Sequence, residues 1–181
     1  MVSLTKAGAP ETVRVDGAFF AVKTDFRYWI RFSQMLKEKH PFSDYDFLYQ
    51  SEIPEDRAAG FNALTEFFLD KKELPKVRNG SDGTRAFDYG LDAGLIFAAF
   101  YELYRIDLTE ARLHWHKFRA LMDGLHGTKF NEVMGYRLYN PNEKTDYKKA
   151  MMELQEMWEL PEELTEEEQK AIDDFDSLLK N

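Results

Sequence analysis

The chain has 181 residues, of which 44% are hydrophobic and 15% aromatic, and its formal net charge is −9. This apolar content is enough for a folded core and excludes an intrinsically disordered chain, and the length fits a single domain. Cysteine is absent, which excludes disulfides, thiol nucleophiles and cysteine-ligated zinc and favours an intracellular protein.

The whole net charge lies at the C-terminal end. Residues 153–181 contain eleven acidic residues and two lysines, whereas residues 1–152 contain 22 residues of each sign. An acidic end repels nucleic acid and anionic lipid, so neither is an expected partner. The simplest interpretation of this segment is a solvated acidic helix face that aids solubility.

The N-terminal part of the chain contains a β-hairpin signal. Residues 1–10 end in a proline and are expected to form a loose, flexible arm. Two short β-rich runs, Thr12–Val15 and Ala18–Val22, flank Asp16-Gly17, a dipeptide that suits a turn with two positive φ angles. A lone hairpin is marginally stable, so we expect it to dock on helices. Its covered face is predicted to contain Val13, Val15, Phe20 and Val22.

Two helices are predicted after the hairpin. Thr24 is the expected N-cap of the first, which reaches about Lys39 and cannot pass Pro41. Pro54 is the expected first residue of the second, because its missing N–H would be unpaired in the first turn anyway. Residues 71–84 follow as a polar loop rich in turn-forming residues. The side chains predicted to be buried are Phe26, Trp29, Ile30, Leu36, Phe61, Leu64, Phe67 and Phe68.

The most apolar stretch of the chain is Gly94–Tyr101. Its eight residues carry no charge, but a membrane span needs about 20 residues, so it is not one. The stretch lies inside a longer helical pattern, Phe87–Arg105, which is apolar around most of its circumference. A helix of that kind is normally buried. We therefore predict that it is the central helix of the domain.

Four further helices are predicted from capping residues and from the glycine or proline that follows each pattern. The last is an acidic C-terminal helix opened by a capping box at Thr165. The chain is thus predicted to be mainly α (α+β), with about seven helices and one small N-terminal hairpin. One domain is expected over residues 11–160, followed by the acidic helix. The four expected segments are 109–123, 128–139, 145–160 and a helix within 161–181.

Two histidines raise the question of a metal site, and their spacing argues against one. His114 and His116 are two positions apart, so in a helix they point about 200° apart and cannot share an ion. The carboxylates are scattered, no serine lies in a nucleophile elbow, and Asn79–Gly83 lacks the lysine of a phosphate-binding loop. The sequence therefore predicts no enzyme, no cofactor and no metal.

The segment Arg112–Phe118 is the densest mixture of aromatic, imidazole and cationic side chains in the chain. It fits a core segment, a surface for a protein partner or a nucleic-acid patch. Trp115 and Phe118 are three residues apart, which favours burial of both on one helix face. Methionine fills cores but also adapts to varied partners. The methionines in the second half of the chain are therefore compatible both with a core and with a surface for a protein partner. They are Met122, Met134, Met151, Met152 and Met157.

Between about residues 90 and 163, a long series of residues occurs in a characteristic order. The series is Leu113–Phe118, Ala120, Leu121, Gly124, Leu125, Thr128–Phe130, Tyr136, Arg137, Pro141, Met151, Leu154, Trp158 and Leu160–Glu163. This order resembles the bacteriophage "gene product fifteen" family of siphophages and Gram-positive prophages. The chain departs from the family at His116, where the family usually has a second tryptophan. It also departs at Leu138-Tyr139, where the family often has Thr-Trp.

The resemblance implies a role in phage tail assembly. Genes of this family typically lie between those for the major tail protein and the tape measure protein, where long-tailed phages encode tail assembly chaperones. It therefore implies a non-enzymatic factor of the host cytoplasm that binds the tape measure protein. The tail tube protein is a further implied partner, and self-association is left open. The candidate partner-binding residues are Trp115, Phe118, Met122, Tyr136, Tyr139, Met151 and Trp158.

Two other roles are compatible with the sequence. A tail or head–tail connector subunit would stay in the virion as a structural component. A host-directed regulator encoded by a prophage would bind a host protein instead. The chaperone role has a physical reason of its own, because a long helical tape measure exposes apolar stripes until tube subunits cover it. A helical protein can cover such a stripe with a groove of its own.

Overall fold

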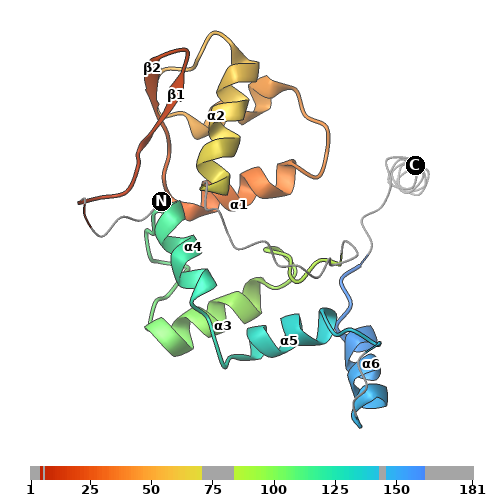
Figure 1. Cartoon of the computed structure of the whole chain (residues 1–181). Coiled ribbons are helices and arrows are strands. Elements are labelled where there is room, and N and C mark those ends of the chain that lie inside the picture. Colours follow the sequence, from red (N-terminus) through yellow and green to blue (C-terminus); the bar gives the residue numbers. More distant parts are fainter. Residues whose placement is uncertain (1–4, 6, 71–83, 143–145, 162–181) are drawn as a thin grey trace, which may run out of the picture.

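The structure, a computed structural model, describes residues 5, 7–70, 84–142 and 146–161 (Figure 1). Within them it contains a two-stranded antiparallel sheet, six α-helices and one 3₁₀ helix, so the predicted mainly α fold with an N-terminal hairpin is confirmed. The elements are β1 (Thr12–Val15), β2 (Ala18–Ala21), α1 (Phe26–Met35), η1 (Phe42–Leu48), α2 (Arg57–Leu69), α3 (Ala93–Tyr104), α4 (Trp115–Asp123), α5 (Lys129–Arg137) and α6 (Lys148–Met157).

Two predicted segments fall largely outside this description. The polar loop at 71–84 is described only at Thr84, and the acidic helix within 161–181 is described only at Pro161. Half of the predicted N-terminal arm, residues 1–4 and 6, is outside it as well.

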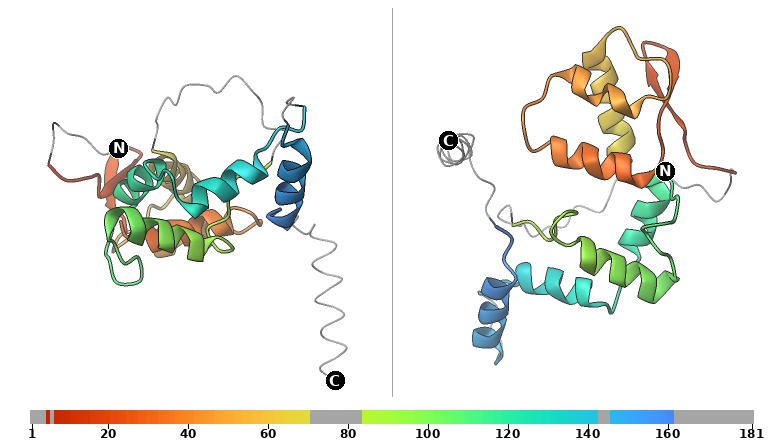
Figure 2. Two further views of the ribbon diagram at one scale, coloured as in Figure 1. Left: turned by 90° about the horizontal axis from the view of Figure 1, so that it is seen from below. Right: turned by 180° about the vertical axis from the view of Figure 1, so that it is seen from behind.

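The described elements form two groups. The hairpin, α1, η1 and α2 gather at one end of the molecule, and α3, α4 and α5 lie below them in the view of Figure 1. Contacts between α1 and α4 join the two groups. α6 packs on α5 and projects at the edge of the molecule, as both views in Figure 2 show.

The predicted hairpin is confirmed in position and turn. Asp16 and Gly17 have φ angles of 48° and 87°, the backbone conformation that an Asp-Gly turn favours. Val13 pairs with Phe20 across the strands, and β1 packs on α2. Val13, Val15 and Val22 are buried as predicted, while Phe20 is half-buried.

The helices α1 and α4 begin later than predicted because their first residues pair with each other. The Phe26 amide donates to the Leu113 carbonyl at 2.9 Å, and the Trp115 amide donates to the Thr24 carbonyl at 2.7 Å. This pairing forms a bridge between Asp25 and His114, and Asp25 is held in extended backbone as the N-cap of α1. Long-range backbone pairing of this kind has no local sequence signal.

The predicted N-cap Thr109 is also displaced, because its hydroxyl and amide both donate to the Asp107 carboxylate, at 2.6 and 2.8 Å. The N-cap of α4 is His114, whose ring nitrogen accepts from the His116 amide at 3.1 Å. In α2 the predicted start at Pro54 is wrong by three residues. Asp56 caps that helix instead, since its carboxylate accepts from the Ala59 amide at 2.9 Å.

The prediction of a central, buried helix at Phe87–Arg105 is wrong in two respects. The helix α3 begins only at Ala93, because Asp88 accepts the backbone amides of Gly90 and Leu91 at 2.7 and 3.0 Å and so forms a turn. Only one side of α3 is buried, through Ile96, Ala99 and Phe100. The helix lies at the surface, and its exposed side is apolar apart from Glu102.

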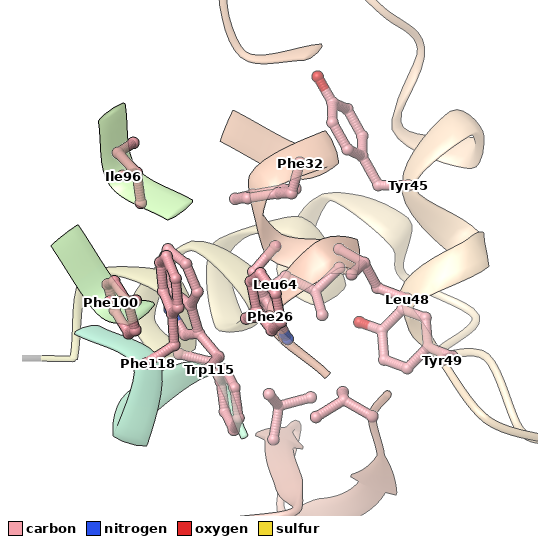
Figure 3. Close-up of a cluster of buried hydrophobic side chains, with 14 of the residues drawn as sticks. Phe26, Phe32, Tyr45, Leu48, Tyr49, Leu64, Ile96, Phe100, Trp115 and Phe118 are labelled. Atoms are coloured by element: carbon pink, nitrogen blue, oxygen red, sulfur yellow. The ribbon is translucent and has the colours of Figure 1, made fainter. Parts of the chain in front are cut away.

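The centre of the core is instead an aromatic cluster between α1, α2 and α4. Trp29 on α1 and Trp115 on α4 are 0% and 1% exposed. Their rings stack on Phe67 and Phe68 of α2, with centroids 4.6 and 5.1 Å apart. Figure 3 shows how the side chains of α3 and α4 join those of α1 and η1 in one cluster. The two groups of elements therefore share one core.

Candidate partner-binding surface

The first two candidate partner residues, Trp115 and Phe118, belong to the core. They are 1% and 0% exposed, and the Trp115 indole nitrogen donates to the Phe68 carbonyl at 3.0 Å. Phe118 stacks on Phe26 with ring centroids 4.5 Å apart. Of the interpretations left open by the sequence, the structure places these two side chains in the core, so they cannot form a surface in this conformation.

Arg119 and Met122, which follow on the same helix, also serve the interior. The guanidinium of Arg119 donates to the Phe68 carbonyl at 2.7 Å and lies over the Trp115 ring. It therefore supplies a cation to the C-terminal end of α2 rather than to a surface patch. Met122 is half-buried and packs against the core cluster.

His114 and His116 lie close together, with ring centroids 5.1 Å apart, yet each has a structural role. His114 Nε2 is 2.7 Å from the Pro10 carbonyl oxygen, and His116 Nε2 is 2.9 Å from that of Phe67. Burial lowers the pKa of both imidazoles. The pair thus ties the N-terminal segment and α2 to the start of α4 as neutral side chains.

The remaining four candidates, Tyr136, Tyr139, Met151 and Trp158, are half-buried where α5 meets α6. The ammonium of Lys129 lies 5.3 Å from the Tyr136 ring centroid and 5.8 Å from that of Trp158. Gln155 on α6 donates to the Tyr139 carbonyl at 3.1 Å. The structure therefore brings these residues together in one region, as a surface prediction requires.

The predicted start of α5 is confirmed at Thr128. Thr128 and Asn131 form a reciprocal capping box, with the hydroxyl 2.7 Å from the amide oxygen of Asn131. The same Asn131 donates to the Leu125 carbonyl at 3.0 Å, which ties the loop to the helix. These contacts fix the direction in which α5 leaves α4 and hence where α6 lies.

A buried ion pair, which sequence reasoning missed, anchors α6. The Arg137 guanidinium makes two hydrogen bonds to the Asp92 carboxylate, at 2.7 and 2.9 Å, and both side chains are almost fully buried. Its Nε donates to the Trp158 carbonyl at 2.6 Å. The end of α5, the start of α3 and the end of α6 therefore meet at Arg137. Asp92 and Arg137 are 45 residues apart in the sequence, so no local sequence pattern predicts that they pair.

The outer part of α6 is an incompletely covered apolar surface. No residue of α6 is fully buried, although Met151, Leu154 and Trp158 form one side of it. Tyr147 just before it is 74% exposed, and Met157 at its end is 72% exposed. Met152 is exposed as well. A short helix with so little cover is suited to packing against a further element.

An open groove of about 440 Å³ lies between the end of α6 and the start of α3. The Asp92–Arg137 pair lies in its lining, and because the two charges satisfy each other, the accessible lining is mainly apolar. The lining residues are Leu91, Asp92, Gly94, Leu95, Arg137, Met157, Trp158, Glu159, Leu160 and Pro161. We take this groove and the exposed side of α6 as the candidate partner-binding surface.

Across the described ranges, no group of three or more histidine, aspartate or glutamate side chains is arranged to hold a metal ion. Each described helix is too short or too polar to cross a bilayer.

The comparisons with known proteins agree with the order of residues noted above. No curated protein and no solved structure matches the chain. The family model described as "Bacteriophage Gp15 protein" matches residues 8–160, which include every described helix and the hairpin. The chain therefore belongs to the bacteriophage Gp15 protein family.

Proposed function

We propose that this phage protein is a tail assembly chaperone that binds the tape measure protein while a long non-contractile tail is built. It would act in the host cytoplasm, with the tail tube protein as a further partner. Family membership supports the phage context, and gene order typical of the family supports the tail. The structural observation that carries the proposal is the half-covered apolar side of α6 beside an open groove.

The chemistry of this surface suits an amphipathic helix. A tape measure protein is a long helical chain whose apolar stripes need cover before the tube encloses them. Met152 and Met157 lie exposed on α6, and their unbranched side chains can adapt to successive turns that differ in shape. A helix-in-groove contact uses these features without any catalytic group.

Co-expression tests the proposal. The cognate tape measure protein should be poorly soluble alone and soluble when this protein is present. A variant carrying Met152→Glu and Met157→Glu should lose this effect, because two carboxylates would be desolvated on binding. The control is Lys149→Glu, which changes the net charge by the same amount at a side chain that is 93% exposed.

The results separate the alternatives. Solubilisation by the wild type and by the control, but not by the double methionine variant, supports both the function and the surface. No solubilisation by any variant, with this protein folded, contradicts the function. Mass spectrometry of purified particles then tests the rival role, because a virion component would be present in a defined copy number and a chaperone would be absent.

A further inference from the structure

The last described residues lie in the groove beside α6. Leu160 and Pro161 are lining residues, and the Pro161 carbonyl accepts a hydrogen bond from the Arg85 guanidinium at 2.7 Å. This bond ties residue 161 to the segment that precedes α3. The residues that follow, 162–181, therefore start from the lining of the groove itself.

The groove exposes apolar side chains at the point where the chain leaves it. Leu91 is 62% exposed and Met157 is 72% exposed. The charges of Asp92 and Arg137 offset each other, and Glu159 is the other charged residue among the described lining residues. Covering such a surface removes apolar area from water. An occupant of the groove therefore needs apolar side chains more than it needs a counter-charge.

The sequence of the segment 162–181 contains an apolar stripe. The capping box at Thr165 is expected to open a helix, and the apolar residues that follow are spaced for one side of it. Asp173, Asp174 and Asp176 fall between them, on the other sides of the same expected helix. The apolar residues, which we call the C-terminal stripe, are Ala171, Ile172, Phe175, Leu178 and Leu179.

The connection between the groove and the expected helix is short. Three residues, 162–164, separate Pro161 from Thr165, and the four steps along the chain span at most about 14 Å. A short tether gives a segment an effective concentration in roughly the millimolar range at a neighbouring site. Even a small apolar contact is therefore populated when this chain makes it with itself. A second copy of the chain has no such advantage.

We propose that residues 162–181 cover the groove of their own chain and that the tape measure protein displaces them. This inference rests on the proposed function, because it concerns regulation of the same surface. The C-terminal stripe packs into the groove as a helix and shields Leu91 and Met157 until the partner binds. The acidic residues of the segment stay in water, where their net charge opposes aggregation of the covered form.

Trp158 reports directly on this cover. It lines the groove and is half-buried, whereas Trp29 and Trp115 are 0% and 1% exposed. In acrylamide quenching of the folded full chain, a change in the quenching constant therefore comes from Trp158. The variant Trp158→Phe checks this assignment, because it should abolish any difference between chains that differ only in the segment 162–181.

Two pairs of substitutions in the full chain test the C-terminal stripe. Phe175→Glu with Leu178→Glu should raise the quenching constant of Trp158, because a charged stripe does not enter an apolar groove. The matched control, Gln169→Glu with Ser177→Glu, adds the same charge on other sides of the expected helix and should be quenched like the wild type. Phe175→Ser with Leu178→Ser repeats the test without added charge. Near-ultraviolet circular dichroism checks that each chain is folded.

The quenching results decide what covers the groove. Protection of Trp158 that is independent of protein concentration, lost in both stripe variants and kept in the control supports the proposal. Equal quenching of the wild type and both stripe variants overturns it. Protection that grows with protein concentration also overturns it, since a second copy would then be the occupant.

Binding of the cognate tape measure protein tests the displacement. If the segment covers the groove in about nine of ten molecules, the apparent affinity of the wild type is lowered about tenfold. The variant Phe175→Ser with Leu178→Ser should therefore bind about tenfold more tightly, and equal affinity overturns the displacement. No binding by any chain contradicts the proposed function, while the quenching of Trp158 still decides whether the segment covers the groove.

Discussion

At the scale of single residues, the Asp92–Arg137 pair has the largest structural consequence. Two opposite charges are removed from water and offset each other through two hydrogen bonds, while a third bond reaches the backbone of the segment after α6. The net stability of such a pair is small, but an unpaired member is costly because its charge stays buried. The pair therefore specifies where α6 lies more than it stabilises the fold.

Removing one partner tests this account. Arg137→Met should lower the free energy of unfolding by about 3–5 kcal/mol, because the Asp92 carboxylate is left buried without a counter-charge. The combined variant Asp92→Leu with Arg137→Met should lose less than Arg137→Met alone, as both charges are gone. Urea unfolding followed by tryptophan fluorescence measures the difference. A combined variant that is no more stable than the single variant would contradict the account.

The two histidines predict a pH dependence of stability. Burial lowers the pKa of His114 and His116 in the folded state below the ordinary 6.5. Below about pH 6.5 the unfolded chain therefore binds more protons than the folded chain, and stability falls as the pH falls. Protonation also removes the ring acceptor with which His114 caps α4.

His114→Asn separates this effect from general acid denaturation. Asparagine keeps an acceptor at the N-cap and does not titrate near neutral pH. Between pH 7 and pH 5, the variant should lose less unfolding free energy than the wild type does. If the unfolding free energies of the two proteins fall equally between pH 7 and pH 5, His114 does not contribute to the pH dependence of stability.

At the scale of elements, the sequence predicted those features that local chemistry decides. The hairpin turn depends on Asp16-Gly17 alone, and the start of α5 depends on Thr128 and Asn131, three residues apart. The starts of α1 and α4 could not be predicted in this way, because backbone pairing between residues 24–26 and 113–115 decides them. Contacts between distant segments override local capping preferences.

The same distinction applies to the candidate partner-binding residues: local spacing predicts the burial of some of them, and contacts between distant segments decide the cover of the others. A helix that is apolar around most of its circumference is expected to be buried, but the pattern does not show which elements cover it. For this reason α3 was wrongly predicted to be the central helix. The burial of Trp115 and Phe118 follows from their spacing on one helix face. The partial cover of Tyr136, Tyr139, Met151 and Trp158 depends on how α6 packs on α5, which the ion pair at Arg137 decides.

The capping box of α5 can be tested on its own. Thr128→Ala should lower the free energy of unfolding by about 1 kcal/mol, since an orphan amide of the first turn loses its acceptor. Thr128→Ser keeps the hydroxyl and should recover most of the loss. Urea denaturation of the three proteins provides the values. If serine and alanine are equally destabilising, the lost methyl group rather than the cap accounts for the effect.

At the scale of the whole molecule, the charge distribution and the family match suggest the same boundary between the folded domain and the acidic C-terminal segment. The family model ends at residue 160, close to the point where the acidic segment begins. The carbonyl of Pro161 still accepts a hydrogen bond from Arg85 at 2.7 Å. A chain ended after Pro161 therefore keeps the contacts of the described fold.

We predict that such a shortened chain folds cooperatively and keeps the tryptophan environment of the full chain. Thermal unfolding followed by near-ultraviolet circular dichroism checks this, with the full chain measured alongside. A shortened chain that lacks a cooperative transition would show that residues 162–181 belong to the core.

The most direct measurement of the central claim is co-purification of the cognate tape measure protein with this protein in about 0.5 M salt, where the Debye length is only about 4 Å. The apolar side of α6 predicts a complex that survives, because residues 1–152 have no net charge to steer an ionic partner. A complex that dissociates in salt would place the contact on the acidic end instead. No complex at any salt concentration, with both chains folded and present, would contradict the chaperone function.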